Sequence, residues 1–117
     1  MQDSMEKLKE RLLKFAKDRD WEKFHTPKNM AMSLSCEVAE LLEHFVWLTE
    51  EESTKVMKDP QKAEAIRQEI GDVINNIVYL ADLLGVDPIQ AAHDKIPLNE
   101  QKYPLDVSQE ISRRHKR

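Results

Sequence analysis

The sequence is poor in the residues that make β folds, cross-links and membrane spans. It contains only 2 glycines, whereas a β-sandwich or barrel needs a turn, usually with glycine, about every ten residues. The single cysteine, Cys36, excludes an internal disulfide framework. No apolar run approaches the roughly 20 residues of a membrane span, and the charged N-terminus does not resemble a signal peptide. We therefore expect an all-α protein that is soluble and cytoplasmic.

An excess of positive charge is also lacking. The formal net charge is −4 and the isoelectric point is near 5.6, which argues against general nucleic-acid binding. The last five positions, 113–117, are basic, and we interpret them as a solvated tail. Charged residues make up 34% and apolar residues 40% of the chain, a balance typical of a folded domain.

Apolar residues spaced three and four apart predict amphipathic helices in the first half of the chain. The first helix is expected over about residues 3–19. A second begins at Thr26 and Pro27, which suit the cap and first helical positions. Thr49 and Glu52 fit a capping box that opens a short acidic helix through Met57. The apolar stripe expected along the second helix is Met30, Leu34, Val38, Leu41, Phe45 and Leu48.

The third helix is the longest that the sequence predicts. It opens at Asp59-Pro60 and ends at Gly85, a suitable residue for the position after a helix. A fourth helix begins at Asp87-Pro88, and Pro97 should kink or end it. The apolar stripe expected along the third helix is Ile66, Ile70, Val73, Ile77, Leu80 and Leu84.

No internal repeat or linker divides these helices. We expect one domain of four-helix-bundle type over residues 1–104, followed by a polar, basic and loose tail over 105–117. Because the predicted apolar faces are wide for so small a core, we also expect self-association.

Two pairs of acidic residues border the apolar stripes of the second and third helices. Glu37 and Glu40 are three residues apart, as are Glu69 and Asp72, so each pair points from one side of its helix. If the two stripes pack together, the four carboxylates converge on one seam. Carboxylates so close together repel one another unless a cation lies between them. Oxygen ligands favour Mg²⁺ or Mn²⁺ as that cation. Such a site suits a substrate that carries phosphates.

Other interpretations of the acidic residues stay open. Glutamates on helices commonly form an ordinary wet face. A ferritin-like di-iron site would need Glu-x-x-His on two helices, and its one instance, from Glu22 to His25, falls at a predicted helix boundary.

The acidic pairs and their flanks resemble a known family. E37-V-A-E40, then 28 residues, then E69-I-G-D72 is similar to the E-x-x-E…E-x-x-D signature of the MazG-like all-α nucleotide pyrophosphohydrolases. The segments 19–29, 37–47 and 95–104 resemble the dCTP pyrophosphatase branch. The resemblance implies Mg²⁺-dependent hydrolysis of a nucleoside triphosphate between its α- and β-phosphates, with dCTP or a modified pyrimidine deoxynucleotide as first choice. It implies that the four acids hold the metal. It also implies that the protein forms a homodimer or a tetramer built from dimers.

The resemblance also implies a substrate-binding set. Trp21 and Trp47 match the aromatic walls around the base, and His25 belongs to the same matching segment. Lys95, Asn99 and Tyr103 match the residues that meet phosphate and sugar from the fourth helix. From the residues alone, both tryptophans suit a core, and the histidine suits a helix cap.

Two departures from the family pattern limit what the resemblance implies. Leu12 stands where the dCTP-preferring relatives have a histidine, which weakens the assignment of cytosine. Asn75-Asn76 stands where relatives carry apolar residues and a tyrosine. Asn76 lies within about 40° of Glu69 and Asp72 around the helix, so it suits sugar or metal-bound water, or a polar contact between subunits.

Three rival functions remain from the sequence. One is hydrolysis of another nucleotide, such as dUTP or phosphoribosyl-ATP, by a member of the same superfamily. Another is a non-catalytic helical oligomerisation module with an acidic face. The last is nucleic-acid binding through the basic residues 113–117.

Overall fold

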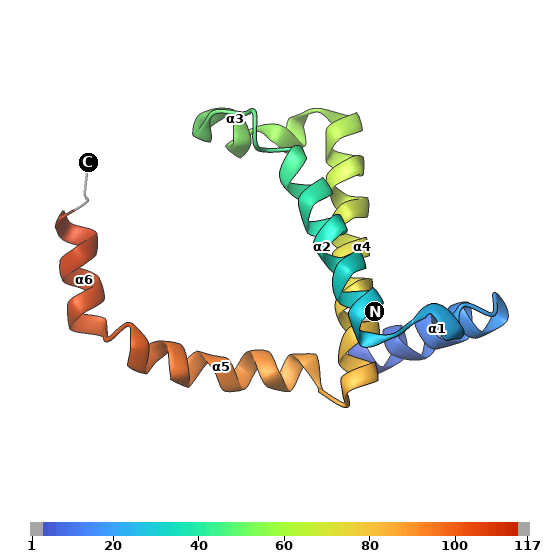
Figure 1. Ribbon diagram of the computed structural model, residues 1–117. Coiled ribbons are helices and arrows are strands. Elements are labelled where there is room, and N and C mark those ends of the chain that lie inside the picture. The colour runs from blue at the N-terminus through green and yellow to red at the C-terminus, as the bar shows by residue number, and fades with distance from the viewer. Residues whose placement is uncertain (1–3, 115–117) are drawn as a thin grey trace. The chain divides into compact units, whose positions relative to one another are not determined.

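The computed structural model describes residues 4–114, and these form helices and no strand (Figure 1). This confirms the predicted all-α class. The chain divides into two compact units, Met1–Val86 and Asp87–Arg117, and each is described by itself. The elements are α1 (Met5–Asp18), the 3₁₀ helix η1 (Glu22–Phe24), α2 (Pro27–Glu43), α3 (Glu50–Thr54), the 3₁₀ helix η2 (Val56–Lys58), α4 (Pro60–Leu84), α5 (Pro88–Lys102) and α6 (Leu105–Arg114).

The first unit is organised around α2 and α4, which lie side by side and run in opposite directions (Figure 1). Helix α1 packs on α4 near the C-terminal end of α4. Few side chains are buried where these helices meet, and all of them are apolar. They are Ala16, Met30, Ile66, Val78 and Ala81. The core therefore lies along the α2–α4 seam and at its junction with α1.

The ends of α4 form as the sequence predicts. The Asp59 carboxylate accepts hydrogen bonds from the backbone N–H groups of Gln61 and Lys62, at 3.0 and 3.3 Å. Pro60 occupies the first turn, where its missing N–H costs no helical hydrogen bond. Gly85 ends the helix in the left-handed region, with φ of 68°, a conformation that glycine adopts without steric cost.

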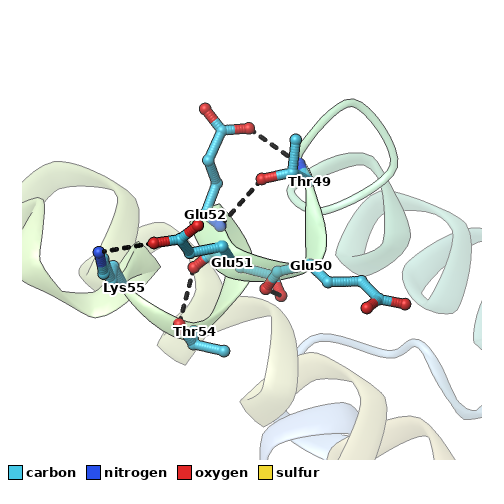
Figure 2. Close-up of polar contacts among 7 residues, drawn as sticks. Thr49, Glu50, Glu51, Glu52, Thr54 and Lys55 are labelled. Carbon is cyan, nitrogen blue, oxygen red and sulfur yellow. Dashed lines mark hydrogen bonds and ion pairs between the residues drawn. The ribbon is translucent and has the colours of Figure 1, made fainter. Parts of the chain in front are cut away.

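A capping box opens α3, as predicted (Figure 2). The Thr49 hydroxyl accepts from the backbone N–H of Glu52 at 3.1 Å, and the Glu52 carboxylate accepts from the N–H of Thr49 at 2.8 Å. The α-helix ends earlier than expected, at Thr54. The chain then continues as the 3₁₀ helix η2, so the predicted helix through Met57 is two shorter elements.

Helix α2 also ends earlier than its apolar stripe suggests. The last helical residue is Glu43, and the chain turns from His44 to Trp47. Phe45 and Leu48 therefore lie beyond the helix, although both remain partly buried. The apolar spacing continues across the helix end because Phe45 and Leu48 are also partly buried, whereas Val46 and Trp47 are exposed.

In the second unit, α5 begins at the predicted cap. The Asp87 carboxylate accepts from the backbone N–H groups of Ile89 and Gln90, both at 3.0 Å. The helix does not end at Pro97 but continues to Lys102. A proline in a helix removes one backbone hydrogen bond, and here the residues on both sides remain helical.

The expectation of a loose segment after Tyr103-Pro104 is wrong for the described residues, because 105–114 form α6. Asp106 lies in its first turn and Arg114 in its last, where their charges complement the helix dipole. The Arg114 guanidinium lies 3.3 Å from the Glu110 carboxylate, one turn away. The remaining basic positions, 115–117, lie outside the described residues.

Within residues 4–114, no helix is long and apolar enough to cross a membrane. Many large apolar side chains are nevertheless exposed in both units. On α2 and α4 these include Val38, Leu42, Ile70, Ile74 and Ile77. The α2–α4 pair thus buries one face and leaves a second apolar face uncovered.

Candidate metal and nucleotide site

Three of the four predicted acids converge on the α2–α4 seam. Glu37 and Glu40 come from α2 and Glu69 comes from α4, and each offers a carboxylate oxygen within 4.8 Å of the others. Glu37 and Glu69 are partly buried, whereas Glu40 is exposed. The predicted meeting of the two acidic pairs is therefore confirmed for these three residues.

The cluster lacks hydrogen-bond donors. One carboxylate oxygen of Glu37 and one of Glu69 are buried without a hydrogen-bond partner. A proton on Glu69 can instead be shared with Glu40 and Glu37. This hydrogen bonding, helped by burial and by repulsion from the same two carboxylates, raises the pKa of Glu69 from 4.5 to about 8.

A divalent cation fits this donor set. The ligands available are carboxylate oxygens alone, which Mg²⁺ and Mn²⁺ prefer. A bound cation would supply a partner for the two buried oxygens and would remove the repulsion between the acids.

The fourth acid, Asp72, lies one turn after Glu69 on α4 but is not part of the three-carboxylate group. Its side chain is exposed and lines an adjacent cavity. Its backbone carbonyl accepts a hydrogen bond from the side-chain amide of Asn76 at 2.8 Å. Asp72 therefore links the acidic cluster to the cavity.

The cavity has a volume of about 500 Å³ and lies among α1, η1, α2 and α4. This is within the ordinary range for a small-molecule site, about 300–1,000 Å³. Its wall is largely apolar and aromatic, with several polar side chains. The lining residues are Leu12, Phe15, Trp21, Phe24, His25, Asn29, Met30, Ser33, Asp72, Asn75, Asn76 and Tyr79.

The end of α1 positions Trp21 in this wall. The backbone N–H of Trp21 donates to the carbonyl of Ala16, and that of Asp20 donates to the carbonyl of Lys17. Asp20 has φ of 55°, so the turn is a Schellman motif with aspartate at the position that glycine usually takes. The Trp21 ring then meets the Phe15 ring edge-on, with centroids 5.5 Å apart.

One face of α4 connects the two parts of the site. From Asp72 onward, the cavity residues Asn75, Asn76 and Tyr79 follow at steps of three, four and seven, which is the spacing of one helical face. Glu69 lies one turn before Asp72. The same face thus carries an acid of the cluster and the wall of the cavity.

Of the predicted substrate-binding residues, the structure brings Trp21, His25 and Asn76 together in the cavity wall. Trp47 lies in the turn after α2, does not line the cavity, and is 89% exposed. The three remaining residues lie in the other unit and are exposed: Lys95 and Asn99 on α5, and Tyr103 at its end. Their contact with the substrate stays a prediction.

Sequence reasoning missed several residues of the wall. The sequence predicts no site role for Phe15, Phe24, Asn29 or Ser33, although all four line the cavity. A usable signal existed for Tyr79, which continues the helical register of Asp72 and Asn76. Its hydroxyl donates to the backbone carbonyl of Leu12 at 2.8 Å, and burial raises the pKa of Tyr79, so the proton remains in place.

Comparison with known proteins places these features in context. A family model described as the MazG-like family matches residues 32–116. Mouse dCTP pyrophosphatase 1 is 39% identical over 94 residues, which are 80% of this chain and 55% of that protein. The human protein of the same name is 37% identical over 101 residues, 86% of this chain and 59% of that protein. The chain therefore spans little more than half the length of these curated relatives.

A solved structure is similar along almost its whole length. It is the crystal structure of a pyrophosphatase from Archaeoglobus fulgidus, which superposes with a TM-score of 0.81 at 40% sequence identity. The match covers 89% of this chain and 95% of that one.

Proposed function

Because the chain belongs to the MazG-like family, we propose that it is a Mg²⁺-dependent hydrolase of nucleoside triphosphates. It cleaves between the α- and β-phosphates and releases a nucleoside monophosphate and pyrophosphate. The observation that carries the proposal is the continuity of the site along α4: Glu69 belongs to the carboxylate group with Glu37 and Glu40, and Asp72, one turn later, lines the aromatic cavity.

The acidic cluster is the part of this site that fits a triphosphate. A Mg²⁺ ion held by Glu37, Glu40 and Glu69 would bind phosphate oxygens and neutralise the charge that develops on them. Asp72 extends the acidic edge toward the cavity, and one of the four acids orients the attacking water. By the family resemblance, Lys95, Asn99 and Tyr103 are further candidates for contact with phosphate and sugar.

The cavity fits the nucleoside. Trp21 offers an indole for stacking on a base, which contributes on the order of 1–3 kcal/mol, and Phe15 supports its ring. His25 and Asn76 provide polar contacts to base or sugar. We propose dCTP or a modified pyrimidine deoxynucleotide as substrate, consistent with the relatives named dCTP pyrophosphatase 1. In the cell, the protein would remove unwanted nucleotides from the cytoplasmic pool.

Self-association is a further part of the proposal. Val38, Leu42 and Ile74 expose apolar side chains on the α2–α4 pair, and Trp47, in the turn after α2, is almost fully exposed. A second copy would bury these side chains, as expected for a homodimer or a dimer of dimers. Trp47 would then complete the base pocket of the neighbouring copy.

A panel of deoxynucleoside and ribonucleoside triphosphates tests the proposal directly. We expect Mg²⁺-dependent release of pyrophosphate and monophosphate in equal amounts, with the highest kcat/KM for dCTP or a modified pyrimidine deoxynucleotide. Preference for dUTP would keep the reaction but change the base, which is a real alternative because the cavity wall has Leu12 rather than a histidine. No turnover of any nucleotide would favour the helical oligomerisation module.

A further inference from the structure

Tyr79 makes an unusual connection across the first unit. Its hydroxyl, on α4, donates to the backbone carbonyl of Leu12, on α1, at 2.8 Å. Every other side-chain hydrogen bond described between residues 4 and 114 joins residues at most five positions apart, as the Asn29 amide and the Phe24 carbonyl do. One further polar contact joins the two helices, the partly exposed pair Lys9 and Asp82 at 3.8 Å. The Tyr79 hydroxyl is thus the short polar link between α1 and α4.

The ring of Tyr79 has a separate contact. It meets the imidazole of His25 edge-on, with centroids 4.7 Å apart and an angle of 62° between the planes. Edge-to-face ring pairs are attractive beyond their buried area, so the tyrosine restrains the imidazole. Residue 25 itself follows the short helix η1 and has no hydrogen bond from its side chain among the described residues. The ring contact with Tyr79 is therefore a specific restraint on this imidazole.

Tyr79 and His25 also separate two cavities. Both residues line the 500 Å³ cavity, and both line a second one of about 110 Å³ between α1 and α4. The second cavity is walled further by Leu13, Ala16 and Leu83. Empty space behind the pair means that packing does not hold the wall from that side. Displacement of either ring would merge the two spaces and enlarge the pocket.

We propose that Tyr79 is a positioning residue for the nucleoside: its hydroxyl holds Leu12 and its ring holds His25, so that the pocket wall is preformed. The inference rests on the proposed function, because it assigns the cavity to the nucleoside. Tyr79 does not touch the phosphates in this scheme. Its loss should therefore weaken binding of the nucleoside and leave the metal end of the site unchanged.

Two substitutions separate the hydroxyl from the ring. Tyr79→Phe removes the hydrogen bond and keeps the ring, whereas Tyr79→Leu removes both and keeps apolar bulk. For Tyr79→Phe we expect KM for the preferred nucleotide to rise about 2- to 12-fold, the range for one hydrogen bond, with kcat within about twofold. Tyr79→Leu should raise KM further. The matched control is Thr54→Val, which removes a hydroxyl-to-carbonyl hydrogen bond of 2.7 Å in α3 and should leave KM unchanged.

A second readout distinguishes positioning from general loosening of the fold. Inhibition by imidodiphosphate, which has phosphates but no nucleoside, reports the metal end alone. We expect its inhibition constant to stay within about twofold of wild type in both Tyr79 variants. A double-mutant cycle of Tyr79→Leu with His25→Ala should be non-additive, because the tyrosine acts through the imidazole.

The possible outcomes are distinct. Wild-type turnover with an unchanged KM in both Tyr79 variants would overturn the positioning role and leave the proposed function intact. A rise in KM matched by an equal rise in the imidodiphosphate constant would also overturn it, because the effect would then be structural. If the wild-type protein hydrolyses no nucleotide, the proposed function fails and the positioning role fails with it.

Discussion

The two ends of the candidate site lie along one face of α4, yet they are built in opposite ways. At the acidic end, three carboxylates face one another and two of their oxygens are buried without partners. At the cavity end, protein groups contact protein groups: the Tyr79 hydroxyl bonds to Leu12, and the ring of Phe15 packs on Trp21. The first end is unsatisfied by the protein itself, whereas the second is preformed.

This difference indicates a division of tasks. A group of unpartnered acids gains most of its order when a cation binds, so its geometry depends on the metal. A cavity held by internal contacts needs no ligand to keep its shape, which lowers the cost of binding a nucleoside. We therefore expect changes at the acidic end to alter kcat, and changes at the cavity end to alter KM.

The largest expected effect is at the acidic end. Glu40→Gln keeps the size of the side chain but removes one of the charges that bind the metal. We expect kcat to fall about 100- to 1,000-fold, the range for loss of one preorganised electrostatic contact, with the helical circular dichroism spectrum unchanged. Initial rates at saturating nucleotide and Mg²⁺ measure this.

The matched control is Glu43→Gln, one turn further along α2. Glu43 is exposed and lies outside the carboxylate group, so its loss should leave kcat unchanged. Full activity of Glu40→Gln would remove the basis for the metal assignment. An equal loss in both variants would show that the overall negative charge matters and the cluster does not.

A smaller effect is expected at the cavity end. Trp21→Ala should raise KM about 5- to 150-fold, as expected for a lost stacking contact of 1–3 kcal/mol, with little change in kcat. Steady-state kinetics over a wide nucleotide range measure this. A drop in kcat without a change in KM would contradict the separation of the two ends.

Trp47→Ala provides the comparison, because Trp47 is exposed in the single chain and lies outside the cavity. If a neighbouring copy covers it, its removal should raise KM and also weaken the oligomer, as sedimentation would show. A raised KM with the oligomer intact would assign it to the base alone, and no effect on either would exclude it from the site.

The acids could be predicted from sequence because their spacing is local and their chemistry is specific. Glu37 and Glu40, and Glu69 as the first member of the second pair, each border an apolar stripe, and two such stripes have few ways to pack. Helix starts were equally predictable, since Asp59 and Asp87 act on backbone groups only two or three residues away.

The cavity wall could not be predicted in the same way. Phe15 continues the three- and four-residue apolar spacing of α1, and only its tertiary position shows that it lines a cavity. The link from Tyr79 to Leu12 joins residues 67 positions apart, which no periodic pattern indicates. The early end of α2 has a related cause, because apolar spacing alone does not show where backbone hydrogen bonds stop. The helix at 105–114 escapes prediction because the segment is polar and basic.

The smallest expected effect concerns the stability of the metal-free protein. The pKa of Glu69 is about 8 in the folded chain and near its ordinary 4.5 when unfolded, so between these values the folded state binds the extra proton. The free energy of unfolding should therefore fall as pH rises from about 4.5 to 8.

Because other groups titrate in this range, the measurement is the difference between wild type and Glu69→Gln during urea unfolding in EDTA. In Glu69→Gln, the part of the decline in unfolding free energy that comes from Glu69 should be absent. In the wild type, Mg²⁺ should suppress the same decline by binding the deprotonated acids. Parallel pH profiles for the two proteins in EDTA would contradict a shared proton at the acidic end, and with it the contrast between an unsatisfied end and a preformed one.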